Sequence, residues 1–158
     1  MKSGTGLLKN KMLNKVIKML ILGEGLLNSA WGFLAPIFAI YIIENITLGN
    51  AGQAAEVAGF SSLVYWVVKS FIQIPIGKYL DKNHGEIDTF WFRFFGMIII
   101  GIVPFGYLFS ILVWHIYALQ ILYALGSAML IPSFYALFTK FIDKGQEGFE
   151  WGMNSTVL

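Results

Sequence analysis

Long apolar runs separated by short polar stretches dominate the pattern of residues along this chain. Four runs meet the requirement for a bilayer crossing, which is about 20 mostly apolar residues. They extend over 19–43, 57–76, 94–113 and 116–138. Because the runs are long and show no alternation of apolar and polar positions, they predict transmembrane helices rather than barrel strands. The expected fold class is an all-α integral membrane protein.

The chain divides into three regions on this basis. Residues 1–18 form a polar N-terminal segment, residues 19–138 form the four-helix membrane region, and residues 139–158 form a polar link and the start of a fifth helix. The first apolar run exceeds the roughly 7–15 residues of a signal-peptide core and follows a long polar lead. We therefore expect it to be a permanent membrane anchor.

Composition agrees with a membrane protein. Hydrophobic residues make up 57% of the chain and charged residues only 13%, about half the proportion of charge in a typical soluble domain. This balance excludes a disordered chain and argues against an ordinary soluble enzyme. The chain has no cysteine, which excludes disulfides, zinc–thiolate sites and a cysteine nucleophile.

The basic residues follow the positive-inside rule. All Lys and Arg residues except Lys69 lie in the N-terminal segment, in the loop after the second run, or in the segment after the fourth. Since basic residues favour cytoplasmic loops, the N-terminus is expected in the cytoplasm and the protein in the cytoplasmic (plasma) membrane. The asymmetry accounts for the basic pI, so no nucleic-acid partner is expected.

Lys69 is the most unusual residue, because ionisable groups inside a membrane are costly and mark functional sites. Nine residues separate it from Lys78, which places it about 13 Å deeper along a helix. Helical spacing puts Trp66 and Gln73 on the same face, which predicts a polar face that lines a cavity or a helix seam. The alternative is a lysine that extends its ammonium to the inner headgroups.

Glu24 and Asn28 share a face of the first predicted helix. Glu24 lies six residues after Lys18, so an interfacial glutamate is one interpretation. The other is a cavity residue. Since consecutive antiparallel helices usually touch, we expect Glu24 to form an ion pair with Lys69.

The last two runs differ in polarity. Gln120, Tyr123 and Ser127 lie on one face of the fourth run and predict either a polar helix seam or contacts with a solute. The third run is almost wholly apolar, which favours a peripheral helix. Phosphate-binding and zinc-protease motifs are absent from the sequence, so we expect no enzyme, no catalytic residues, no cofactor and no metal site.

The loop after the second run resembles the signature loop of the major facilitator superfamily of secondary transporters. Gly77, Asp81 and Lys82 match its small, acidic and basic positions, whereas the trailing glycine is displaced and Glu86 and Ile87 replace its basic pair. The resemblance implies that Gly77 allows close helix contact. It also implies that Asp81 forms a gate contact, with Lys82 at the basic position of that motif.

This resemblance implies the N-terminal portion of a 12-helix transporter, within its N-terminal six-helix half. Such a protein moves a small solute by alternating access, driven here by an H⁺ or Na⁺ gradient. Its partners are the lipid bilayer, the solute, the coupled ion and the remainder of the transporter chain. The expected solute and ion pathway contains Glu24, Asn28, Trp66, Lys69, Gln73, Gln120, Tyr123 and Ser127. Two alternatives stay open, a self-contained four-helix exporter that dimerises and a non-transporting scaffold subunit.

Overall fold

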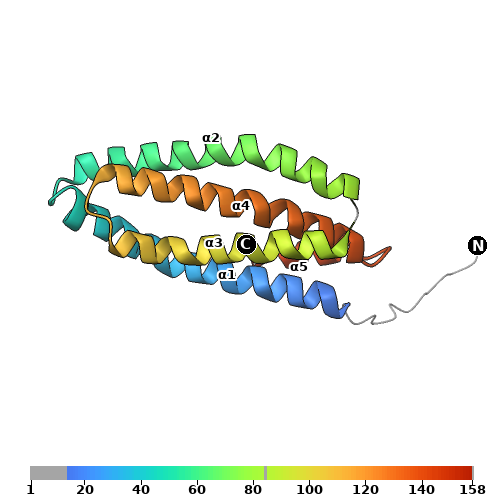
Figure 1. Cartoon of the computed structure of the whole chain (residues 1–158). Helices are drawn as coiled ribbons and strands as arrows, with labels where there is room; N and C mark the ends of the chain where they lie inside the picture. The colour runs from blue at the N-terminus through green and yellow to red at the C-terminus, as the bar shows by residue number, and fades with distance from the viewer. Residues whose placement is uncertain (1–13, 84, 158) are drawn as a thin grey trace, which may run out of the picture.

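The computed structural model describes residues 14–83 and 85–157, and every regular element in these ranges is a helix (Figure 1). The elements are α1 (Lys15–Tyr41), the π-helix η1 (Ile42–Ile46), α2 (Ala51–Asn83), α3 (Glu86–Leu108), α4 (Val113–Phe141) and α5 (Glu147–Ser155). The all-helical prediction is confirmed. The short α5 lies in the segment where the sequence predicts the start of a fifth helix.

Four of these helices are long and apolar enough to cross a membrane, which confirms the number of predicted spans. Every helix begins earlier than its predicted run, α3 ends five residues before the predicted boundary at 113, and the largest extension is in α2. Its 33 residues correspond to about 50 Å of helix, against about 30 Å of hydrocarbon. The connection between the first two predicted runs, 19–43 and 57–76, is therefore short, because α2 already begins at Ala51. At this start the Asn50 side chain accepts a hydrogen bond from the backbone N–H of Gln53.

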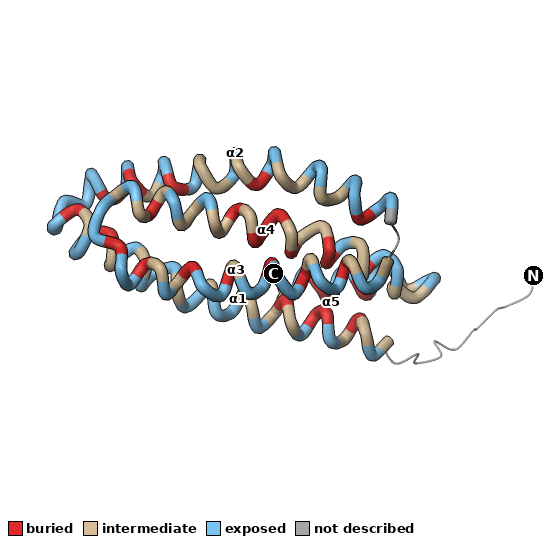
Figure 2. The backbone as a smooth tube through the Cα atoms, in the orientation of Figure 1, coloured by how far each residue is buried: buried red, intermediate tan, exposed pale blue. Residues whose placement is uncertain are grey.

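α4 is the central helix of the bundle. α2 and α3 pack along it, and α1 contacts both α4 and α5 (Figure 1). In its most apolar window, 44% of the α4 residues are buried, against 6% in α1, and Figure 2 shows the buried positions following α4. The third predicted span is therefore not peripheral within this chain, because α3 forms the most extensive of the helix pairs.

The contact between α3 and α4 depends on two glycines. A Cβ atom at Gly96 would lie 2.8 Å from the backbone oxygen of Gly126, and one at Gly126 would lie 2.9 Å from a side-chain carbon of Ile100. Small residues allow two helix backbones to approach this closely in a membrane, where packing replaces the hydrophobic effect as a driving force.

Two apolar clusters fill opposite ends of the bundle. The first surrounds Ile42, Val57 and Val103, near the connection between α3 and α4. The second surrounds Ile21 and Phe138 and includes side chains of α5. The outward surface carries many large apolar side chains in addition, including Phe33 and Phe71, each 77% exposed. A bundle with apolar groups on both its inside and its outside is suited to lipid rather than to water.

The glycine contact gives a first test. Gly96→Ala is expected to lower the free energy of unfolding by about 1–3 kcal/mol, because the new methyl group would overlap the α4 backbone. Gly101→Ala is the matched control, since no atom lies within 4 Å of its Cβ position. The two variants are compared by unfolding in mixed micelles, and an equal stability of both would contradict the close α3–α4 contact.

Membrane crossing is tested by cysteine labelling, for which the absence of native cysteine provides a clean background. Glu56 and Lys82 are both exposed and lie near opposite ends of α2. Glu56→Cys and Lys82→Cys are expected to react with an impermeant maleimide from opposite sides of a sealed vesicle. Labelling of both from one side would rule out a membrane-spanning α2.

Candidate functional site

A polar cavity of about 220 Å³ lies between the two apolar clusters, and all five α-helices contribute to its lining. Its polar and aromatic lining residues are Glu24, Asn28, Trp31, Tyr65, Tyr123, Ser127, Phe134, Tyr135 and Asn154. Four of the predicted pathway residues are therefore brought together in one place: Glu24, Asn28, Tyr123 and Ser127. Their convergence follows from the packing of α1 against α4.

The carboxylate of Glu24 forms a buried ion pair with Arg93 of α3. Arg93 Nη2 lies 2.9 Å from Glu24 Oε1, and the two side chains are only 10% and 12% exposed. The predicted pair between Glu24 and Lys69 is therefore wrong. The reason is topological, because α2 packs against α4 rather than against α1, so Lys69 does not approach α1.

Sequence reasoning missed Arg93 because it was assigned to a loop. α3 begins at Glu86 after the extended residue Gly85, and its first turn carries Glu86 and Asp88. Acidic residues in a first turn favour the positive end of the helix dipole, so this pattern marks the start of the helix. Had the third span been predicted to begin at Glu86, Arg93 would have been placed two turns inside the helix.

Arg93 is only partly satisfied. Its Nη1 is buried without a hydrogen-bond partner among the described residues, while its guanidinium carbon lies 5.2 Å from the centroid of the Phe134 ring. Replacing a buried pair by apolar residues is often neutral, but removing one partner leaves an uncompensated charge. The pair therefore connects α1 to α3, and loss of either residue would leave the other as an unpaired buried charge.

Lys69 is buried but lies against aromatic rings instead of a carboxylate. Its Nζ is 4.4 Å from the centroid of Trp66 and 5.3 Å from that of Tyr65. Within residues 14–83 and 85–157, no carboxylate forms a salt bridge with Lys69. Cation–π contacts of this kind stabilise a desolvated ammonium by about 2 kcal/mol or more, so the rings account for a lysine at this depth.

The remaining predicted pathway residues lie outside the central cavity. Trp66 is 59% exposed and lines neither this cavity nor the groove described below. Gln120 donates a hydrogen bond from Nε2 to the hydroxyl of Tyr107 at 3.2 Å, which corresponds to the polar seam that was the alternative interpretation. Gln73 lines the groove.

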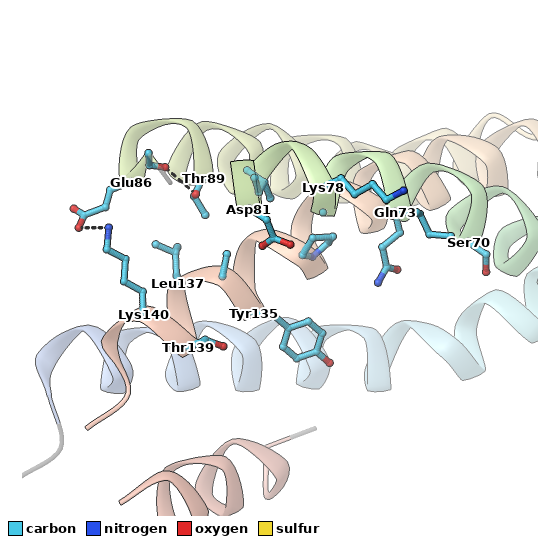
Figure 3. A pocket seen from close by; sticks show the side chains of 16 residues that line it. Ser70, Gln73, Lys78, Asp81, Glu86, Thr89, Tyr135, Leu137, Thr139 and Lys140 are labelled. Carbon is cyan, nitrogen blue, oxygen red and sulfur yellow. Dashed lines mark hydrogen bonds and ion pairs between the residues drawn. The ribbon is translucent and has the colours of Figure 1, made fainter. Parts of the chain in front are cut away.

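That groove opens at the α2–α3 end, by which we mean the end of the bundle where α2 leads into α3 (Figure 3). It has a volume of about 990 Å³, is lined by α2, α3 and α4, and includes Gly77 and Asp81. Tyr135 lines both the groove and the central cavity and extends into the groove in Figure 3. Across the groove mouth, Lys140 Nζ lies 2.9 Å from Glu86 Oε1, with both side chains about half exposed.

The predicted roles of the signature-loop residues are met only in part. No described atom lies within 4 Å of the Cβ position at Gly77, so the close helix contact expected there is not present; Gly96 and Gly126 make such a contact instead. Asp81 faces the groove, and Lys82 is exposed outside it.

α5 contributes two buried polar residues that sequence analysis did not single out. Glu150 is 0% exposed and accepts a hydrogen bond from the backbone N–H of Asp143, and Asn154 is 2% exposed. α5 turns back along the bundle (Figure 1), and Trp151 contacts Phe138 with ring centroids 4.3 Å apart. In the preceding turn, a hydrogen bond from the Gly145 N–H to Glu147 lowers the pKa of that carboxyl.

The described residues hold no group of three or more His, Cys, Asp or Glu side chains that could bind a metal ion. What the site offers instead is the Glu24 carboxylate, hydroxyl and amide groups, and aromatic faces around a partly open cavity. Ligand pockets commonly combine apolar and aromatic walls with a few polar groups of this kind.

The ion pair is tested by paired substitutions. Arg93→Met is expected to lower the free energy of unfolding by about 3–5 kcal/mol, because Glu24 is left buried and unpaired. The double variant Glu24→Met/Arg93→Met should recover most of this loss. Lys140→Met, at the exposed pair with Glu86, is the control and should change stability by no more than about 1 kcal/mol.

Unfolding in mixed micelles measures all three variants. Failure of the double variant to recover stability would show that Arg93 acts through something other than its pairing with Glu24.

No protein-family model, curated protein or solved structure matches this chain.

Proposed function

We propose that this protein is part of a membrane transporter that moves a small solute through the central cavity. The observation that carries the proposal is the cavity with its polar groups, which lies inside a bundle whose outward surface carries many large apolar side chains. Polar and ionisable groups are costly within a membrane and are retained at solute and ion pathways. A purely structural bundle would gain nothing from a cavity lined by a carboxylate, amides and hydroxyls.

The arrangement of the openings supports alternating access. The groove at the α2–α3 end approaches the cavity, and Tyr135 borders both. At the other end, the apolar cluster around Ile42 and Val103 closes the bundle. With the orientation that the basic residues favour, the groove faces the cytoplasm, and this conformation is open toward that side.

The signature-like loop at Gly77, Asp81 and Lys82 supports an assignment to the major facilitator superfamily. In this proposal the bundle belongs to the N-terminal six-helix half of a larger transporter. Asp81 lines the open groove, and a gate contact of Asp81 would form when the groove closes. The Lys140–Glu86 pair lies at the same mouth and would move with it.

Glu24 is the residue that we propose for ion coupling. It is paired with Arg93 here, and a conformation that separates them would leave a buried carboxylate free to take up a proton. The cost of an unpaired buried charge would then link protonation to the conformational change.

Transport is tested with the full chain in sealed liposomes. Uptake of labelled alanine, glucose, succinate and butylamine is measured with and without an imposed pH or sodium gradient. We expect gradient-dependent uptake of at least one of these, reduced more than tenfold by Ser127→Leu, because the larger side chain fills the cavity. Ser29→Leu, on the exposed face of α1, should leave uptake unchanged.

Uptake no faster than in protein-free liposomes for every solute would contradict a transport function. Equal uptake by the Ser127 and Ser29 variants would mean that the cavity is not the pathway.

A further inference from the structure

We infer that the central cavity binds a small organic ammonium ion. This inference rests on the transport function proposed above and deepens it, because it names the chemical class of the solute. It depends on which hydrogen-bonding groups of the cavity are unsatisfied, on the aromatic wall beside them and on the cavity volume.

Asn154 presents a buried hydrogen-bond acceptor with no partner. It is 2% exposed, it lines the cavity, and its Oδ1 accepts no hydrogen bond from any described residue. Buried polar atoms are almost always hydrogen-bonded, and an amide oxygen can only accept. A ligand group that satisfies the Oδ1 atom of Asn154 must therefore be a donor.

α1 adds two further acceptors to the same cavity. The Arg93 guanidinium donates a hydrogen bond to Oε1 of Glu24, while Oε2 accepts none from residues 14–83 and 85–157. The Asn28 Nδ2 donates to the backbone oxygen of Glu24 at 3.0 Å, which leaves the Asn28 Oδ1 available to accept. A carboxylate and two amide oxygens together match a group with several N–H donors and a positive charge, which describes an ammonium ion.

The aromatic wall of the cavity favours the same charge. Tyr123 lies between Trp31 and Tyr65, with ring centroids 4.5 Å and 4.9 Å away. Ring faces attract cations, and the Tyr65 ring already has the ammonium of Lys69 at 5.3 Å from its centroid. Arg93 does not line the cavity, so an anion bound there would meet the Glu24 carboxylate without reaching the guanidinium.

The volume limits the size of the ammonium ion. At about 220 Å³, the cavity is smaller than the roughly 300–1,000 Å³ that holds drug-sized ligands. The class that fits is therefore a primary amine with a short alkyl or single-ring substituent.

The test measures equilibrium binding to the full chain in lipid nanodiscs, separately from flux. The probes are butylammonium and 2-phenylethylammonium, with 3-phenylpropionate as an anion of similar size. We expect both ammonium ions to saturate the protein at up to millimolar concentration, as followed by calorimetry, and the anion to bind at least tenfold more weakly. Asn154→Leu should weaken ammonium binding at least tenfold while the protein stays folded, because the change removes an unsatisfied buried oxygen.

Asn45→Leu is the matched control, since Asn45 is exposed at the far end of the bundle, and it should bind both ammonium ions normally. Tighter binding of the anion, or unchanged ammonium binding in Asn154→Leu, would overturn the assignment. Absence of binding by both ammonium ions would also overturn it. Uptake of one of the other solutes in liposomes would in that case leave the transport proposal standing.

Discussion

The fold depends on one constraint, which is that polar groups inside an apolar bundle must find their partners within the protein. Hydrocarbon offers no hydrogen bonds to replace them. The Glu24–Arg93 pair is the clearest response, because it joins two helices that otherwise make few contacts. Lys69 shows a second response, in which aromatic rings stabilise a buried charge that forms no ion pair with a described carboxylate. Glu24 and Lys69 are therefore stabilised by different partners, Glu24 by Arg93 and Lys69 by aromatic rings.

The position of α4 decides how these polar groups come together. Because Gly126 lets α4 approach the backbone of α3, α4 lies at the centre and α2 packs along its other side. Tyr123 and Ser127 lie on this central helix. The helix face that contains them therefore lines the cavity and does not lie on the outer surface of the bundle. The same segment of α4 therefore packs closely against α3 through Gly126 and lines the cavity through Tyr123 and Ser127.

The same features connect structure to the proposed transport. A bundle that is sealed by apolar side chains at one end and grooved at the other has the asymmetry that alternating access requires. The cavity lies where α5 returns to the bundle, so Asn154 joins the acceptors supplied by α1. Movement of α5 relative to α1 would change the cavity and its hydrogen bonding together. This couples the site to the geometry of the bundle.

Much of the fold was predictable from sequence, because long apolar runs have few alternatives in a membrane. The runs predicted four spanning helices, and each run lies in a helix that is long and apolar enough to cross a membrane. Helix periodicity also placed Glu24 with Asn28, and Tyr123 with Ser127, on shared faces. These local features depend on neighbouring residues only, which is why the pattern along the chain was sufficient for them.

Which faces meet was decided only by the tertiary structure. Periodicity does not state which helix packs against which, so Glu24 was assigned to Lys69 although its partner is Arg93. The same limitation hid Asn154, since nothing local distinguishes it from an exposed residue of a short polar helix. The sequence by itself thus determined the helices and their polar faces. Packing around α4 determined the ion pair and the cavity, because both depend on contacts between residues distant along the chain.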